Sequence, residues 1–168
     1  AEVEKIVALA HRYEVCVVPF GGGTNIVGGV DPDAAEERMI VTMNMCRMNR
    51  LLRLDAHSQT AVLEAGATGP ELEQQLNAKG WSLGHFPDSF EYSTIGGWVA
   101  TRSAGMQSDA YGKIEDMLIA AKFVTPAGTI ETREVPASSA GPDLNRMICG
   151  SEGVLGIITE VTMRVHRV

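Results

Sequence analysis

The glycines constrain the fold of this chain most, because several stand together directly after short apolar runs. Residues 15–18 read Val-Cys-Val-Val, and residues 19–25, here called the glycine loop, continue as Pro-Phe-Gly-Gly-Gly-Thr-Asn. This order predicts a buried strand and then a loop whose backbone can approach a ligand closely. Successive N–H groups in such a loop form a concave donor site for anions, phosphate above all. A plain surface turn is the alternative, and the triplet alone does not decide between the two.

Composition narrows the classes of function. The chain has 168 residues, of which 45% are apolar, and a net charge of −7, so we expect one ordered domain with a sizeable core. An acidic chain with no lysine and arginine cluster and only 5% aromatic residues argues against nucleic acid as a partner. Cys16, Cys46 and Cys149 include no CxxC pair, which predicts reduced thiols, two of them in apolar surroundings, and no metal site. No apolar run has the length of a membrane span.

Apolar periodicity predicts helices and strands in an irregular order. The expected helices span residues 2–13, 68–80 and 142–148, and the expected strands span 15–18, 39–43, 51–55, 60–65, 117–125, 129–133 and 157–166, the last with one apolar face. Residues 81–113 are dense in Gly, Ser, Thr, Asp and Pro, and such a long irregular stretch is usually functional. Neighbouring strands look like hairpins, so we predict an α+β fold. No Rossmann or Walker pattern follows the first strand, which disfavours the usual nucleotide sites.

Three later segments are similar in composition to the glycine loop. Residues 88–94 precede Ile95-Gly96-Gly97-Trp98, and Thr94 is placed to cap a helix that starts there. Residues 101–104 carry two hydroxyls and one guanidinium, and residues 150–156 form a glycine-framed turn before the last strand. Each segment alone is more often a structural turn. Four of them in one domain predict an extended ligand that has a pyrophosphate and flat rings.

The order and spacing of these motifs resemble the PCMH-type FAD-binding domain of the vanillyl-alcohol oxidase superfamily over nearly the whole chain. Residues 84–98, 101–106 and 111–116 are most similar to the alkyldihydroxyacetonephosphate synthases (alkylglycerone-phosphate synthases) within it. The resemblance implies two small subdomains with mixed sheets flanked by helices, and noncovalent FAD. It also implies that residues 1–168 are a PCMH-type domain truncated at both ends. The cap domain that carries the family's catalytic residues is absent, so no catalytic residue is assigned.

The resemblance implies, position by position, where FAD is held. The pyrophosphate is expected at Pro19, Phe20, Gly21, Gly22, Gly23, Thr24 and Asn25. The pyrophosphate and flavin side is expected at Asp88, Ser89, Phe90, Glu91, Tyr92, Ser93 and Thr94. The isoalloxazine is expected along Thr101, Arg102, Ser103 and Ala104. The adenine and ribose half is expected near Glu152, Gly153, Val154, Leu155, Gly156, Ile157 and Ile158.

The activity implied by the resemblance is ether-lipid synthesis. The acyl chain of acyl-dihydroxyacetone phosphate is exchanged for a fatty alcohol without net redox change. The family also implies a peroxisome or glycosome location, and it allows a homodimer and peripheral membrane contact through regions outside this chain. An FAD-dependent D-lactate or glycolate type of 2-hydroxy acid dehydrogenase shares the glycine motifs and is the alternative. A degenerate domain with a structural role is a third reading.

Three side-chain expectations stay open on the sequence alone. His85 is either a loop histidine bonded to the backbone or a residue beside the flavin. Arg102 either pairs with a surface carboxylate or places a charge near the flavin ring. A bulky residue at Gly22 or Gly23 is expected to cost FAD binding more than folding, because a Cβ there would block the pyrophosphate.

Overall fold

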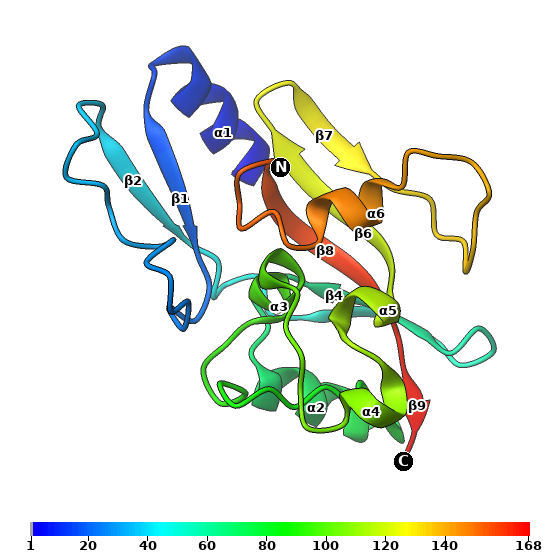
Figure 1. The fold of residues 1–168 in the computed structure, drawn as a ribbon. Coiled ribbons are helices and arrows are strands. Elements are labelled where there is room, and N and C mark those ends of the chain that lie inside the picture. The colour runs from blue at the N-terminus through cyan, green and yellow to red at the C-terminus, as the bar shows by residue number, and fades with distance from the viewer. Residues whose placement is uncertain (1) are drawn as a thin grey trace.

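Helix α1 and the first strand pair form one side of the molecule. The computed structural model describes residues 2–168 and begins with α1 (Glu2–Arg12), whose apolar residues Val3, Val7 and Ala10 recur at helical spacing and are buried. Strand β1 (Cys16–Phe20) pairs in parallel with β2 (Ile40–Asn44), and the long connection between them contains the glycine loop (Figure 1). The sequence placed these strands to within two residues.

A five-stranded antiparallel sheet forms the centre of the molecule, in the order β3-β4-β8-β6-β7. Its strands are β3 (Leu51–Asp55), β4 (Thr60–Glu64), β6 (Leu118–Thr125), β7 (Gly128–Glu131) and β8 (Ile157–Arg164). Strand β8 was expected to bury one face only, yet Ile158 and Thr162 are buried as well as Ile157 and Val161. Because β8 is the middle strand and other elements cover both faces of the sheet there, its alternation is hidden. Each sheet has a single type of pairing: β1 and β2 are parallel, whereas all pairs in the five-stranded sheet are antiparallel.

Capping residues in the sequence indicate where two of the helices begin. Helix α2 (Gly69–Asn77) begins after Thr68, whose backbone N–H donates to Glu71 Oε2 at 3.0 Å. Helix α3 (Ile95–Thr101) begins after Thr94, whose hydroxyl oxygen accepts from the N–H of Gly97 at 3.4 Å. The α+β prediction is therefore confirmed, with helices and hairpins in the expected irregular order.

The sequence missed the shortest elements. These are α4 (Ser108–Tyr111), α5 (Ile114–Met117), β5 (Trp81–Ser82) and β9 (His166–Arg167), whereas α6 (Leu144–Ile148) was expected. Strands β5 and β9 pair with each other. Elements of two to four residues do not complete a helical or strand period, so periodicity cannot reveal them.

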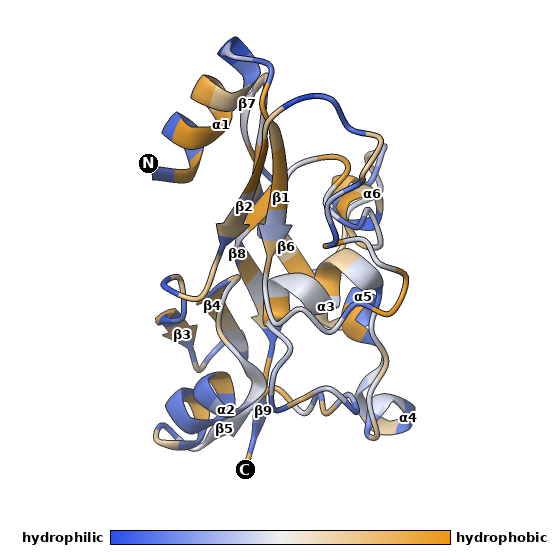
Figure 2. Cartoon of the chain, turned by 90° about the vertical axis from the view of Figure 1, so that its left-hand side faces the viewer, coloured by the Kyte–Doolittle hydropathy of each residue, from blue (hydrophilic) through white to orange (hydrophobic). Residues whose placement is uncertain are grey.

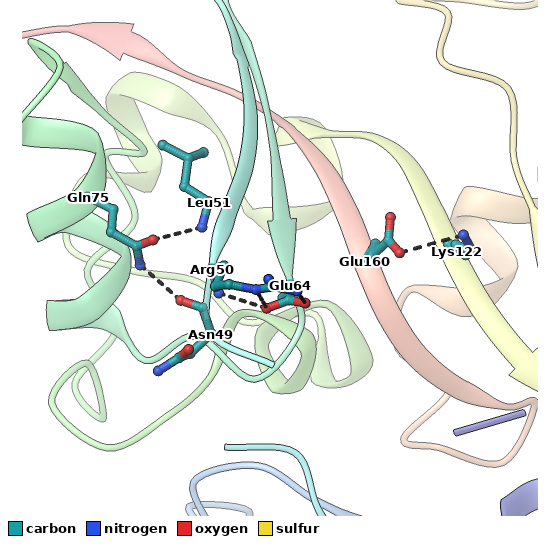
Figure 3. A network of polar contacts seen from close by, with 7 residues as sticks. All are labelled: Asn49, Arg50, Leu51, Glu64, Gln75, Lys122 and Glu160. Atoms are coloured by element: carbon teal, nitrogen blue, oxygen red, sulfur yellow. Dashed lines mark hydrogen bonds and ion pairs between the residues drawn. The ribbon is translucent and has the colours of Figure 1, made fainter. Parts of the chain in front are cut away.

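Side-chain bonds tie the start of β3 to its neighbours (Figure 3). Leu51 N donates to Gln75 Oε1 at 2.8 Å, and Gln75 Nε2 donates to the carbonyl of Asn49 at 2.9 Å. The Arg50 guanidinium donates to both carboxylate oxygens of buried Glu64, at 3.1 and 2.9 Å. These bonds hold the pKa of Glu64 below its ordinary value. They fix the segment that runs from β2 into the central sheet.

Two apolar clusters stabilise the fold. The larger one joins the central sheet to α2, α3 and α5, and its fully buried side chains include Leu63, Leu72, Trp98 and Met163. The smaller one lies between α1, β2 and the ends of β6 and β8, and consists of Val3, Val7, Met43, Met45, Val124 and Ile157. Figure 2 shows the matching concentration of hydrophobic residues along β1 and β6. In residues 2–168 no helix has both the length and the apolar character needed to cross a membrane.

The three cysteines differ from one another in burial. Cys149 is buried, Cys16 is half-buried and Cys46 is exposed in the turn after β2, and all three are free thiols. Cys46 is exposed because it lies in the turn that leaves the β1–β2 pair, outside both apolar clusters.

Candidate functional site

The four segments singled out in the sequence converge on one cavity of about 500 Å³. It is lined by residues of the glycine loop after β1, the loop before α3, helix α3 itself and the turn before β8. The predicted residues that line it are Pro19, Gly21, Gly22, Gly23, Thr24, Asn25, Asp88, Ser89, Ser93, Thr94, Thr101, Ser103, Glu152, Gly153, Gly156, Ile157 and Ile158. Segments far apart in the sequence thus form a single site.

Eight of the predicted residues lie outside the cavity lining. They are Phe20, Phe90, Glu91, Tyr92, Arg102, Ala104, Val154 and Leu155. The Phe90 ring packs against Trp98 at 6.3 Å between centroids, so it belongs to the core. Tyr92 and Val154 are among the exposed apolar side chains. A contiguous motif therefore does not present every one of its side chains to one ligand.

The sequence did not assign ten further lining residues. They are Ile26, Val27, Gly29, Val30, Met45, Ala65, Gly96, Gly97, Trp98 and Ala100. Gly96, Gly97 and Trp98 directly follow the predicted segment 88–94 and the capping residue Thr94, so the sequence did contain a signal for them. Met45 and Ala65 directly follow β2 and β4, and only the pairing of those strands reveals that their ends lie beside the glycine loop.

The glycine loop presents unused hydrogen-bond donors. Within residues 2–168 the backbone N–H groups of Gly21, Gly22, Gly23 and Thr24 donate no hydrogen bond. Gly23 has a φ of +67°, a left-handed conformation that turns neighbouring N–H groups toward one side. Gly21 and Gly22 are half-buried and Gly23 and Thr24 are exposed, so these N–H groups are accessible from the cavity, and successive free N–H groups of a glycine turn suit an anionic ligand. A pyrophosphate matches this donor set.

Two glycines of this loop are required by contacts within the protein. A Cβ on Gly22 would overlap the carbonyl oxygen of Tyr92, and a Cβ on Gly21 would overlap the hydroxyl of Thr94. The loop therefore lies directly on residues 92–94. A bulky residue at Gly22 was expected to cost FAD binding more than folding. The structure instead predicts a large cost to folding, because the obstacle is backbone that cannot move aside locally.

The two glycines of α3 differ in the space that a side chain would find. A Cβ on Gly96 would lie 2.8 Å from both the Cβ and the carbonyl oxygen of Ala65, so Gly96 lets the helix pack on the end of β4. A Cβ on Gly97 would meet only the Thr94 hydroxyl, at 3.4 Å, which is an ordinary contact. Because Gly97 lines the cavity, its missing side chain leaves space for a ligand.

Serine hydroxyls and one indole form a bonded chain along the cavity. Trp98 Nε1 donates to Ser93 Oγ at 2.6 Å, and Ser89 Oγ also donates to Ser93 Oγ at 3.0 Å. Ser93 Oγ in turn donates to the carbonyl of Ser89 at 2.8 Å. These bonds fix the orientation of loop 88–94 against α3.

His85 lies behind this wall and is not bonded to the backbone, contrary to one of its two readings. It is 1% exposed, its Nε2 is 2.6 Å from Ser103 Oγ, and its ring meets Trp98 edge-on at 5.0 Å. Burial lowers the pKa of His85 to about 4, so the ring is neutral at neutral pH.

Arg102 follows neither of the readings given for it. Its Nε donates to the carbonyl of Cys149 at 3.0 Å, and an Nη donates to the carbonyl of Arg146 at 3.3 Å. Its backbone is left-handed, with φ of 53°, as it ends α3. The guanidinium therefore satisfies carbonyls at the end of α6, because these carbonyls lack helical partners.

The cavity lining contains no lysine, arginine or histidine among residues 2–168. Its two carboxylates, Asp88 and Glu152, are exposed at the surface. An anion in this cavity is therefore held by neutral N–H and O–H donors, whereas the apolar residues Met45, Trp98 and Ile158 suit a flat ring. The arrangement is built to bind and orient an extended ligand.

The similarity of this chain to known proteins agrees with a cavity for an extended ligand. The family model described as "FAD binding domain" matches residues 1–133. The alkyldihydroxyacetonephosphate synthase of Dictyostelium discoideum is 54% identical over 167 residues, which cover 99% of this chain and 27% of that protein. The Trypanosoma brucei brucei protein of the same name is 48% identical over 164 residues, which cover 97% of this chain and 27% of that protein. A mitochondrial D-lactate dehydrogenase (cytochrome) of Arabidopsis thaliana is 36% identical, covering 99% of this chain and 29% of that protein.

The fold agrees with a solved structure. An alkyldihydroxyacetonephosphate synthase, crystallised in P212121, superposes with a TM-score of 0.94 at 53% identity and covers 99% of this chain. The match covers 30% of that chain. The present chain thus spans less than a third of the length of the relatives it matches.

Proposed function

The chain belongs to the FAD-binding domain family. We propose that it is the FAD-binding domain of an alkyldihydroxyacetonephosphate synthase. FAD is the cofactor of this family domain. The observation that carries the proposal is the set of free N–H groups at Gly21–Thr24, residues that line a cavity without cationic side chains. Those donors suit noncovalent binding of a pyrophosphate.

Within this proposal, the residues of the chain bind and position the flavin. The glycine loop holds the pyrophosphate, Gly97 leaves room beside α3, and Trp98 and Ile158 offer apolar surface to flat rings. When bound, FAD supplies an electron-accepting ring that activates the dihydroxyacetone phosphate unit for exchange. Buried Trp98 and Ile158 form part of the lining and would exclude water from a ring surface packed against them.

The whole enzyme is proposed to replace the acyl chain of acyl-dihydroxyacetone phosphate by a fatty alcohol, in ether-lipid synthesis and without net redox change. Similarity to the named synthases, which exceeds that to the D-lactate dehydrogenase, supports this over the dehydrogenase alternative. A location in peroxisomes or glycosomes, a homodimer and membrane contact stay predictions from the family resemblance.

The test uses the full-length protein loaded with FAD. It is mixed with acyl-dihydroxyacetone phosphate and a fatty alcohol, and released fatty acid is measured, with the protein lacking FAD as the control. The proposal predicts release that requires both the alcohol and FAD. No release, together with bleaching of the flavin by D-lactate or glycolate in the absence of oxygen, would replace the synthase by the dehydrogenase.

A further inference from the structure

The bond between His85 and Ser103 is unusual because only one end of the histidine is satisfied. His85 Nε2 lies 2.6 Å from Ser103 Oγ. Nδ1 is buried and has no hydrogen-bond partner among residues 2–168. The ring is 1% exposed and is held edge-on against Trp98. An unpaired polar atom at this depth constrains which ring nitrogen carries the proton.

A neutral imidazole has one N–H, which sits on Nδ1 or on Nε2. On Nδ1 it would be a buried donor without an acceptor, and orphaned buried N–H groups are rarer than orphaned acceptors. On Nε2 it donates to Ser103 Oγ and leaves only a lone pair at Nδ1. Burial keeps the ring neutral at neutral pH by lowering the pKa of His85 to about 4. The structure therefore favours the Nε2–H form.

This choice of proton position determines what Ser103 offers to a ligand. If Ser103 Oγ accepts from His85, its own proton is unused, and within residues 2–168 nothing accepts it. Ser103 lines the cavity. By contrast, the Ser93 hydroxyl accepts two hydrogen bonds and donates one, and the Ser89 hydroxyl donates its hydrogen bond to Ser93. Of the three serines that line the cavity, Ser103 is therefore the one whose hydroxyl is free to donate a hydrogen bond to a ligand.

We propose that His85 sets the hydrogen-bonding direction of Ser103, so that the Ser103 hydroxyl donates to an acceptor atom of the ligand. The acceptor class is a carbonyl oxygen or an unprotonated ring nitrogen, both of which the isoalloxazine of FAD carries. His85 is thus a positioning residue that acts through Ser103. The inference rests on FAD occupying this cavity, as in the proposed function.

The test measures the dissociation constant of FAD for the full-length protein by flavin fluorescence at pH 7. Ser103→Ala removes the donor and is expected to weaken binding about five- to tenfold, the effect of one hydrogen bond. His85→Asn places an amide near the Nδ1 position and leaves Nε2 empty, so it should weaken binding by the same factor. His85→Gln places an amide N–H near the Nε2 position, so its affinity should stay within about twofold of the unmodified protein.

The double variant gives the sharpest result. If His85 acts through Ser103, His85→Asn adds no further loss when Ser103 is already alanine. Multiplying losses would show that His85 acts on its own and would overturn the inference. Equal losses for His85→Gln and His85→Asn, in proteins with unchanged thermal unfolding midpoints, would also overturn it. Ser138→Ala, at an exposed serine, is the matched control and should leave the affinity unchanged.

These outcomes are separable from the proposed transferase activity. The predicted pattern of affinities without fatty-acid release would contradict the synthase function and leave the role of Ser103 standing. Fatty-acid release together with full affinity in Ser103→Ala would do the reverse. An unmodified full-length protein that binds no FAD would overturn both.

Discussion

The glycine loop and helix α3 both border the cavity and both carry adjacent glycines, which in the loop were expected to allow close approach to a ligand. In the loop, Gly21 and Gly22 instead allow contact with residues 92–94, and the contribution to a ligand is the free N–H groups. In α3, Gly96 packs on Ala65, whereas Gly97 lines the cavity and a Cβ on it would meet only the Thr94 hydroxyl, at 3.4 Å. Adjacent glycines in one motif are therefore needed for different reasons, and the residues packed against each glycine in the folded structure show which reason applies.

The largest expected effect comes from the loop. Gly22→Ala places a methyl group against the carbonyl oxygen of Tyr92, which is backbone, so the loop must shift as a whole. We expect a loss of about 3 kcal/mol in the free energy of unfolding and a parallel loss of FAD affinity. Urea unfolding and an FAD titration of the same sample measure both. Unchanged stability with lost FAD would restore the simpler ligand-only explanation of this glycine.

The next effect concerns His85, which packs against Trp98 behind the α3 wall. Its folded pKa of about 4 lies below the ordinary value of 6.5, so below pH 6.5 the unfolded chain binds a proton that the folded chain does not. Stability is therefore lost as the pH falls, by about 2 kcal/mol between pH 7 and pH 5 from this residue. Urea unfolding of His85→Gln at both pH values should show a correspondingly smaller loss. The exposed His57→Gln is the control, and an equal loss in both variants would refute the assignment.

A matched pair in α3 separates packing from ligand space. Gly97→Ala should keep or raise stability, by up to about 1 kcal/mol, because alanine favours a helix. Its methyl group enters the cavity, so we expect FAD affinity to fall about tenfold, or about 1.4 kcal/mol. Gly96→Ala should instead destabilise the fold, since its methyl group meets Ala65. Thermal unfolding and flavin fluorescence of the two variants check this. Identical behaviour of the two would remove the distinction drawn between them.

The smallest effect tests the contact between loop and helix. Thr94→Ala removes the hydroxyl that caps α3 and should cost about 1 kcal/mol of stability. The same hydroxyl obstructs a side chain at Gly21, so Gly21→Ala should cost less in the Thr94→Ala background than alone. Urea unfolding of the two single variants and the double variant gives the coupling. Strictly additive costs would show that Thr94 is not what excludes a side chain there.

The sequence predicted the longer periodic elements and the four segments that form the cavity. Helix α1 and strands β3, β4 and β6 repeat their apolar residues often enough to be recognised. Between residues 81 and 113 the capping residue Thr94 indicates the start of α3, whereas α4 and β5 are too short to show a period in the sequence.

The details of the site could not be predicted for a different reason. The packing of Gly22 on Tyr92, and the bonds of Arg102 and His85, join residues that are distant in the sequence. A motif indicates which backbone segments approach a ligand, but long-range contacts decide which side chains face it. Phe90 and Arg102 are part of the predicted motifs, yet Phe90 packs against Trp98 in the core and Arg102 donates to carbonyls at the end of α6.

A crystal structure of the full-length protein with FAD would test the central claim most directly, because it places the pyrophosphate relative to the glycine loop. We predict pyrophosphate oxygens about 2.7–3.2 Å from the backbone nitrogens of Gly21–Thr24, with no lysine, arginine or histidine of this chain in contact. A pyrophosphate bound elsewhere, with these N–H groups facing water, would contradict the account.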